Sequence, residues 1–193
     1  MMIIHLIRHG KTYANEQKLY CGAADLPLSD NGIFELKEFK KQGIYTESAD
    51  IYYTSGLMRT EQTLNILFGY VNRTALTQLA EFNFGIFEMK SHELIKDQPD
   101  YMEWINDETG LISCPGGENR QEFKSRAVKG YEMIEENAKH VNSAFVVCHG
   151  GVIACIMEHL FPDDKDFYKW QPVQGRGYTI TCAQGGIKLY KTI

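Results

Sequence analysis

The stretch MIIHLIRHGKT, residues 2–12, runs from an apolar segment straight into a group of polar residues. A short apolar run of this kind predicts a buried β-strand over residues 2–7. Arg8, His9 and Gly10 follow that strand without a spacer. In open α/β sheets the carboxyl ends of the strands are the places where ligands bind. This stretch therefore indicates both the class of fold and the position of a site.

Strands and helices alternate along the rest of the chain. Ser29 suits an N-cap, Leu36 and its apolar neighbours recur at helical spacing, and Gly43 is expected to end that helix. Further strands are expected over 49–53, 75–79 and 143–148, further helices over 54–70, 118–139 and 151–160, and a closing hairpin over 178–182 and 187–190 across the AQGG turn. The alternation predicts a three-layer α/β/α domain with a mostly parallel sheet and one antiparallel edge strand.

Segment 91–117 interrupts this alternation. It holds two prolines, a GG pair and only short helical pieces. We expect it to be an insert that lies over the sheet and covers the ligand site. No repeat, linker or shift in composition divides the remainder, so residues 1–193 are expected to form a single domain.

The overall composition excludes several classes of protein. With 44% hydrophobic and 23% charged residues over 193 positions, the chain can bury one good core. Its net charge of −5 argues against a nucleic acid or an anionic membrane surface as a partner. There is no apolar run of about 18 residues, no basic leader and no CxxC pair among the five cysteines, so we expect a cytoplasmic protein with reduced thiols. Nothing in the sequence indicates an oligomeric state.

Polar residues stand where the predicted strands end. They are Arg8 and His9 after the first strand, Arg59 at the head of the helix after the second, Glu81 after the third, and His149 with Gly150 after the late strand. Because parallel strands end at the same edge of a sheet, these side chains are expected to converge. Arginine matches the oxygens of a phosphate group, neutral histidine is a nucleophile, and a carboxyl group can give and take a proton. The set predicts binding and cleavage of a phosphoryl group without a metal ion.

Four stretches, in order, resemble the histidine phosphatase superfamily, which also contains the cofactor-dependent phosphoglycerate mutases: LIRHGKTYAN with DLPLSDNG after it, TSGLMRTEQT, LAEFNFGIFE and VVCHGGVI. RHG alone would be weak evidence, whereas the ordered set is specific. The resemblance covers nearly the whole chain and implies a phosphoglycerate mutase-like fold of the phosphatase branch. PGGEN at 115–119 resembles the turn that precedes the long helix of the family.

The resemblance also implies roles for individual residues. His9 would be the nucleophile that becomes phosphohistidine, and Glu81 would act first as general acid and then as general base. The catalytic set is completed by Arg8, Arg59 and a cationic His149, and the substrate-binding set comprises Arg8, Asn15, Gly22, Arg59, His149 and Gly150. No metal ion and no cofactor are expected.

The chain departs from the family pattern at three positions near the expected site. Lys11 stands where glutamate is common, Leu19 where arginine is frequent, and Lys90 where glycine is expected. One hypothesis is that Lys11 and Arg176 contact a second anionic group of the substrate. The alternative, which we favour, is that both are ordinary solvated charges.

Two further assignments are open. Glu88 follows Glu81 by seven residues and is the alternative carboxylate, although Glu81 is preferred. Tyr101 and Trp104 of the insert either pack it onto the sheet or form a lid that excludes water and selects the alcohol portion of the substrate.

These features lead to three hypotheses on function. The first, which we favour, is a metal-independent phosphomonoesterase of the histidine acid phosphatase type that acts on a small-molecule phosphate ester with an acidic to neutral pH optimum. The second is phosphoglycerate mutase-type phosphoryl transfer, but the mutases of the family carry longer excursions after the glutamate and near the C-terminus. The third is a weakly catalytic module that binds a phosphate ligand, ranked last because all five catalytic groups are present.

Overall fold

The strand β1 (Met2–Arg8) lies inside a mixed sheet. The computed structural model describes residues 2–162, 166–182 and 188–193. The other strands in these ranges are β2 (Ile51–Thr54), β3 (Thr74–Ala75), β4 (Ser143–Cys148), β5 (Gly177–Cys182) and β6 (Lys188–Thr192), in the spatial order β3-β2-β4-β1-β5-β6. β1, β2, β3 and β4 run parallel, and β5 pairs antiparallel with both β1 and β6. The predicted parallel sheet with an antiparallel edge is confirmed, while the AQGG turn lies outside the described residues.

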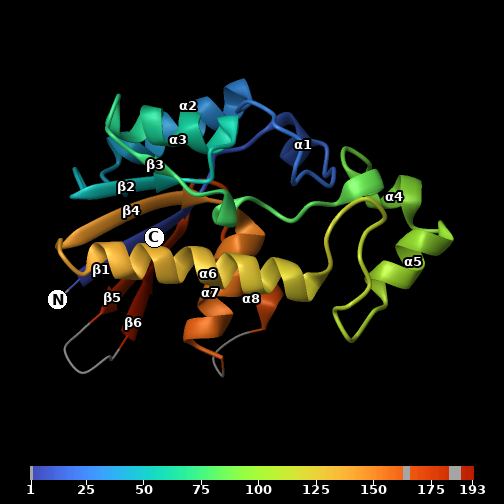
Figure 1. Ribbon diagram of the computed structural model, residues 1–193. Coiled ribbons are helices and arrows are strands. Elements are labelled where there is room, and N and C mark those ends of the chain that lie inside the picture. The colour runs from blue at the N-terminus through green and yellow to red at the C-terminus, as the bar shows by residue number, and fades with distance from the viewer. Residues whose placement is uncertain (1, 163–165, 183–187) are drawn as a thin grey trace.

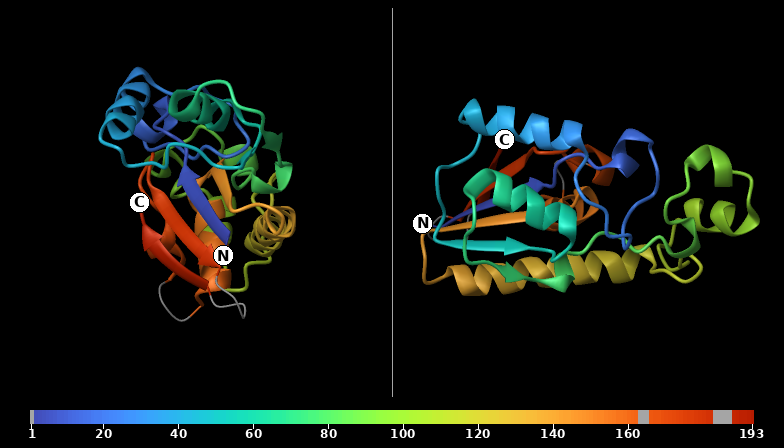
Figure 2. Two further views of the ribbon diagram at one scale, coloured as in Figure 1. Left: turned by 90° about the vertical axis from the view of Figure 1, so that its left-hand side faces the viewer. Right: turned by 90° about the horizontal axis from the view of Figure 1, so that it is seen from above.

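Helices cover both faces of this sheet. They are α1 (Tyr13–Glu16), α2 (Asp30–Lys41), α3 (Met58–Phe68), α4 (His92–Ile95), α5 (Pro99–Ile105), α6 (Arg120–Ala138), α7 (Gly150–Leu160) and α8 (Phe167–Trp170), with the 3₁₀ turns η1 (Thr77–Leu79) and η2 (Gly85–Phe87). The helices α2 and α3 lie on one face and α6 and α7 on the other (Figures 1 and 2), which is the predicted three-layer arrangement. None of the helices in the described ranges is long and apolar enough to span a membrane.

Alternating side chains of β4 supply both halves of the core. Phe145 and Val147 pack on the side of α2 and α3, with Leu36 and Leu64. Val146 and its alternate neighbours belong to the cluster on the side of α6 and α7. A strand buried on both faces has no polar alternation to show, which explains why this segment reads as a continuous apolar run.

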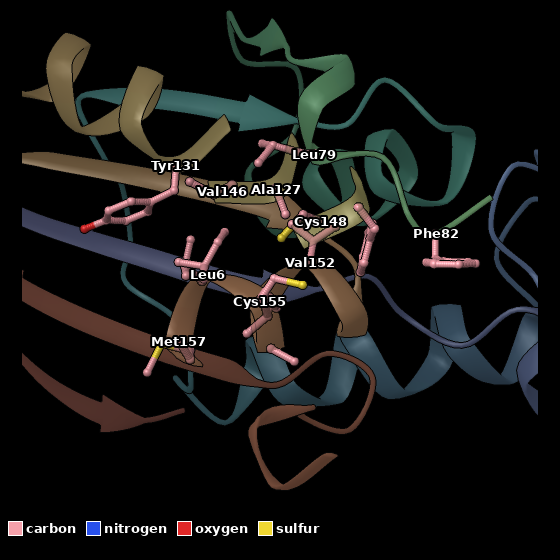
Figure 3. Packing of buried hydrophobic residues seen from close by; sticks show 14 of the residues in the cluster. Leu6, Leu79, Phe82, Ala127, Tyr131, Val146, Cys148, Val152, Cys155 and Met157 are labelled. Atoms are coloured by element: carbon pink, nitrogen blue, oxygen red, sulfur yellow. The ribbon is translucent and has the colours of Figure 1, made fainter. Parts of the chain in front are cut away.

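The larger half of the core lies between the sheet and the α6–α7 pair (Figure 3). Leu6 and Val146 from the strands meet Ala127 of α6 and Val152 of α7 there, and all four side chains are fully buried. Phe82 lies at the edge of the same cluster, on the segment that leaves the sheet (Figure 3). The core therefore extends continuously from the sheet toward the insert.

Local signals set the ends of the helices, and those at both ends of α2 were predicted. The Ser29 hydroxyl accepts a hydrogen bond from Gly32 N at 3.1 Å and caps α2, and Gly43 has a positive φ of 68° just beyond the end of that helix. Asn119 of the PGGEN turn caps α6 and forms a capping box with Glu122.

The predicted strand over 75–79 is wrong in part. The strand β3 covers only Thr74–Ala75, and the chain then turns into η1. The apolar residues Ala75, Leu76 and Leu79 recur at a spacing that suits a helical turn better than strand alternation. That turn brings Leu79 fully inside, next to Gly130 of α6.

The insert was predicted to lie over the sheet and to cover the ligand site; it lies instead beyond the end of the sheet (Figures 1 and 2), although its residues do line a cavity next to Arg8 and Glu81. Its helices α4 and α5 project beyond the carboxyl ends of the parallel strands (Figures 1 and 2). The segment carries buried side chains of its own, with Ile95 and Tyr101 packed around Phe87 and Trp104. These aromatic contacts hold the insert at the end of the sheet where the polar residues gather.

The core on the side of α2 and α3 gives a test of the packing. Phe145 is fully buried, and its ring lies 4.6 Å from that of Phe68 between centroids. Phe145→Ala should lower the free energy of unfolding by about 3–5 kcal/mol, because a cavity replaces the ring. The matched control is Phe34→Ala on α2, where 63% of the residue is exposed and the change should stay within about 0.5 kcal/mol. Equal losses in urea denaturation would contradict this core.

Candidate active site

The parallel register of β1 and β4 brings two histidines together. Arg8 lies opposite Cys148, so His9 and His149 are the next residues on adjacent strands. His9 N donates to Cys148 O at 3.0 Å, and the two imidazole rings have centroids 5.1 Å apart. Because the chain goes from β1 to α2 on one face and from β4 to α7 on the other, the pair sits where the topology of the sheet switches.

One nitrogen of His9 is fixed by a backbone carbonyl. His9 Nδ1 lies 2.7 Å from Gly10 O. A carbonyl only accepts, so Nδ1 carries the proton and Nε2 presents the lone pair. Gly10 N in turn donates to the Thr63 hydroxyl at 3.0 Å, which anchors the turn to α3. The imidazole is therefore held in the tautomer that leaves the Nε2 lone pair available.

The second imidazole, His149, has the opposite tautomer. Arg59 Nε donates to His149 Nδ1 at 3.3 Å, so this nitrogen is the acceptor. His149 Nε2 then carries the proton and donates to the Ser55 hydroxyl at 2.8 Å. Ser55 directly follows β2, and the reasoning from strand ends could have found it.

Burial and two cations keep both histidines neutral. Burial lowers the pKa of His9 well below its ordinary value, and the guanidinium groups of Arg59 and Arg8 lower it further. Burial, followed by Arg59, also lowers the pKa of His149 well below its ordinary value. His149 is therefore neutral in this structure, and the cationic form expected of it in the phosphoryl-transfer step stays a prediction.

The guanidinium of Arg59 is held by a loop whose shape depends on Glu88. Arg59 Nη1 and Nη2 donate to the carbonyls of Ala24 and Gly22, each at 2.8 Å. The Glu88 carboxylate accepts from the backbone N–H groups of Gly22, Ala23 and Ala24 at 2.9 to 3.3 Å. Glu88 therefore shapes the loop, a role that the sequence did not reveal, and Gly22 acts on the site through Arg59.

The carboxylate of Glu81 lies at the start of α7. Its Oε2 accepts from Gly151 N at 3.1 Å and its Oε1 from Phe82 N at 3.0 Å. A Cβ on Gly151 would lie only 2.5 Å from Glu81 Oε1, so glycine is required for this approach. Of the two candidate carboxylates, Glu81 is the one next to the His149–Gly151 turn.

Arg8 and Asn15 offer free donors to the site. Arg8 Nη1 donates to Pro172 O at 2.8 Å, while the buried Nε of Arg8 has no hydrogen-bond partner among the described residues. A Cβ on Gly150 would lie 3.0 Å from Arg8 Cζ, so this glycine gives the guanidinium its space. Asn15 Oδ1 accepts from Thr12 N at 3.0 Å, which leaves the amide NH₂ as the group that Asn15 can offer a ligand.

These groups adjoin a cavity of about 740 Å³. Arg8, Asn15, Glu81 and Gly151 line one side of it, and the other side is formed by residues of the insert, α6 and α8, among them Trp104, Arg120, Lys124 and Tyr168. His9, Arg59 and His149 lie behind this lining and are not part of it, with exposures of 4%, 1% and 0%. The cavity is much larger than a phosphate group and has room for the alcohol portion of an ester.

The two aromatic residues of the insert have different positions. Tyr101 is buried in the insert, and its hydroxyl lies 2.6 Å from that of Tyr20 and 2.8 Å from His92 Nδ1. Trp104 is buried against the rings of Phe82 and Phe87 and also lines the cavity. Both residues therefore pack the insert, and a lid role for Trp104 stays a prediction.

Lys11 and Arg176 lie elsewhere. Lys11 Nζ forms an ion pair with Glu35 Oε1 at 2.6 Å, and the Arg176 guanidinium stacks 4.2 Å from the ring centroid of Phe39. Neither residue lines the cavity. These contacts do not support the hypothesis of a second substrate anion, but neither charge is simply solvated as the alternative had it, because each has a partner within the protein. Within the described ranges, no group of three or more His, Cys, Asp or Glu side chains is placed to hold a metal ion.

Comparison with known proteins identifies the family of this arrangement. The model of the histidine phosphatase superfamily (branch 1) matches residues 4–191. The chain belongs to the histidine phosphatase superfamily. It is 30% identical over 163 residues to the adenosylcobalamin/alpha-ribazole phosphatase of Escherichia coli K12, covering 82% of this chain and 79% of that protein. It is 25% identical over 177 residues to the 2,3-bisphosphoglycerate-dependent phosphoglycerate mutase of Bradyrhizobium diazoefficiens, covering 83% of each.

Solved structures of the superfamily share the fold. The alpha-ribazole phosphatase of Shigella flexneri matches with a TM-score of 0.85 and 26% identity, over 100% of this chain and 96% of that one. A phosphoglycerate mutase from Bacillus anthracis matches with a TM-score of 0.79 at 22% identity, over 100% and 92% of the two chains, and shows the fold alone. The relatives include phosphatases and mutases, so membership in the superfamily supports an enzyme that acts on phosphate esters.

The lowered histidine pKa values predict a pH dependence of stability. Below pH 6.5 the unfolded chain takes up a proton on each of these histidines and the folded chain does not, so stability is lost as the pH falls from 6.5 toward the folded pKa. Between pH 7 and 5, one such histidine accounts for up to about 2 kcal/mol. In the variant His149→Gln, the free energy of unfolding should lose that part of its pH dependence. The measurement is urea denaturation in a buffer that contains no phosphate.

The matched control is His140→Gln, because His140 is exposed at the end of α6. This variant should keep the wild-type dependence of stability on pH. If His149→Gln also kept it, His149 would not be a neutral buried histidine in the folded protein.

Proposed function

We propose that this chain is a metal-independent phosphomonoesterase that works through a phosphohistidine on His9. The observation that carries the proposal is the orientation of His9, whose Nδ1 is fixed by Gly10 O while Nε2 keeps its lone pair. Arg8 and Arg59 supply guanidinium groups beside it, and Glu81 lines a cavity together with Arg8. A positioned nucleophile, two phosphate binders and one acid–base group are what phosphoryl transfer through an enzyme intermediate requires.

The first half of the reaction forms the phosphoenzyme. His9 Nε2 attacks phosphorus, a P–N bond forms, and the P–O bond to the alcohol breaks. The protonated carboxyl of Glu81 gives its proton to the departing alkoxide oxygen, so the alcohol leaves neutral. Arg8 and Arg59 face the developing charge with guanidinium donors, and a bound phosphate dianion favours protonation of the nearby His149.

The second half releases the phosphate. The Glu81 carboxylate takes a proton from a water molecule, the water oxygen attacks phosphorus, and the P–N bond breaks with its electron pair returning to His9 Nε2. Inorganic phosphate leaves, and Glu81 is again protonated for the next cycle. Because His9 stays neutral well below its ordinary pKa, the nucleophile remains available at acidic pH, which supports the acidic to neutral optimum.

The substrate is proposed to be a small-molecule ester. The cavity of about 740 Å³ accepts a substantial alcohol portion, and the E. coli relative, a phosphatase, makes alpha-ribazole phosphate one candidate. The net charge of −5 does not favour nucleic acid as substrate or an anionic membrane as partner. We also propose that the enzyme works in the cytoplasm, where buried free thiols such as Cys148 and Cys155 stay reduced.

The test is release of inorganic phosphate from a panel of phosphomonoesters, alpha-ribazole phosphate and 3-phosphoglycerate included, with a chelator present. The wild-type protein should turn over at least one ester. His9→Ala should lose about 10⁴-fold or more in kcat, and Glu81→Gln about 10²- to 10⁴-fold on alkyl esters. No phosphate release together with exchange between 2- and 3-phosphoglycerate would establish a mutase instead. Binding of phosphate ligands without either activity would indicate a binding module.

A further inference from the structure

The segment that carries Glu81 has no regular structure of its own. Glu81 lies between η1, which ends at Leu79, and η2, which begins at Gly85. Hydrogen bonds from Gly151 N and Phe82 N hold its carboxylate but not the backbone from which it extends. Backbone carbonyls outside helices and strands need partners when they are buried, so the position of Glu81 depends on what satisfies this segment.

Arg126 of α6 supplies those partners. Its Nη1 donates to the carbonyls of Gln78 and Ala80 at 3.0 and 2.8 Å. Its Nη2 donates to the carbonyl of Glu81 itself at 3.3 Å. A guanidinium is a rigid planar fork, so three carbonyls bound to one fork have fixed positions relative to each other.

Glu118 completes this contact from the other end of the segment. Arg126 Nη2 and Nε donate to Glu118 Oε1 and Oε2 at 2.6 and 3.3 Å. Asn83 N donates to Glu118 Oε1 at 2.8 Å, and Glu118 N donates to Asn83 O at 3.1 Å. The ion pair therefore holds the chain on both sides of Glu81, from residue 78 to residue 83.

The ion pair is built into a firm part of the fold. The Arg126 and Glu118 side chains are 27% and 16% exposed, and the guanidinium lies 5.3 Å from the ring centroid of Phe123. Arg126 belongs to α6, which packs against α7, and α7 provides Gly151 N to the Glu81 carboxylate. The backbone of Glu81 is thus held by α6, and its carboxylate is held by α7.

We propose that Arg126 and Glu118 form a clamp that positions Glu81 for proton transfer during ester cleavage. The inference rests on the proposed function, because it assigns a purpose to the placement of the acid–base group. Neither clamp residue touches the substrate; both act through Glu81 as positioning residues. A misplacement of about 1 Å in such a group can cost about 100-fold in rate. A variant of the clamp should therefore lose rate only on substrates whose leaving group needs a proton. A purely structural role would lower the rate on all substrates.

Two esters distinguish these cases. An alkyl phosphate needs Glu81 to protonate its leaving group, whereas 2,4-dinitrophenolate leaves 2,4-dinitrophenyl phosphate without a proton. The quantity kcat/KM reports the steps through phosphoenzyme formation, and the ratio of the two kcat/KM values from one sample does not depend on how much of it is folded. Arg126→Met should lower kcat/KM by about 10- to 100-fold on the best alkyl ester of the panel and by less than about 3-fold on the dinitrophenyl ester.

Further variants control for charge and for folding. Arg126→Lys keeps the positive charge but not the fork, and its ester ratio should stay within about 3-fold of that of Arg126→Met. Glu118→Gln should change the ratio in the same direction by a smaller factor, since its amide oxygen can still accept from Asn83 N. The matched control is Glu135→Gln, because Glu135 of α6 forms a 2.7 Å ion pair with Lys188 of β6 at similar exposure and lies far along the helix from Glu118. Its ratio should be that of the wild type.

Glu81→Gln removes the acid–base group itself, so its change in the ratio of the two kcat/KM values is the upper limit for any clamp variant. Suppose that Glu81→Gln lowered kcat/KM only on the alkyl ester, whereas Arg126→Met lowered it equally on both esters or on neither. The clamp proposal would then be overturned, and the proposed function would stand. Full recovery in Arg126→Lys would also overturn it, because charge alone would then suffice. If Glu81→Gln itself showed no ester selectivity, the assigned role of Glu81 would fail, and the clamp would fall with it.

Discussion

The pairing of β1 with β4 is the interaction on which the site depends. Their parallel register sets Arg8 opposite Cys148 and thereby places His9 beside His149. A slip of one residue would turn every side chain of β1 to the other face of the sheet and separate the histidines. The backbone hydrogen bond from His9 N to Cys148 O continues the ladder one residue beyond the strand. The polar pair is therefore positioned by the most buried part of the molecule.

The electrostatics of the site follow from that burial. Two guanidinium groups, from Arg8 and Arg59, stand close to two imidazoles that burial and these charges keep neutral. Glu81 supplies a negative charge near Arg8, but the buried Nε of Arg8 has no hydrogen-bond partner among the described residues. A bound phosphate would satisfy this donor and neutralise the arginines. On the proposed function, the stability lost by burying this one unpaired donor is recovered when a phosphate ester binds.

The centre of the site could be predicted because the end of each strand is visible in the sequence as a change from apolar to polar residues. Apolar runs mark the strands, and polar residues such as Arg8 and His149 follow them directly. Ser55 obeys the same rule and was missed only because serine is common in turns. The structural roles of Glu88 and Arg126 could not be found, because their partners are backbone groups of distant loops that only the tertiary structure assembles. The insert was misplaced for a similar reason, since its aromatic packing carries no periodic signal.

The central claim is that the phosphoryl group passes through Nε2 of His9. Its most direct test is rapid quenching of Glu81→Gln with 2,4-dinitrophenyl phosphate, because the first step then needs no acid and the second lacks its base. Digestion at neutral to alkaline pH, mass spectrometry and ³¹P NMR would locate the phosphate and its linkage. The account predicts an acid-labile phosphate on His9 Nε2, absent in the double variant with His9→Ala. Phosphate on another residue or on Nδ1, or no phosphoenzyme at all, would contradict it.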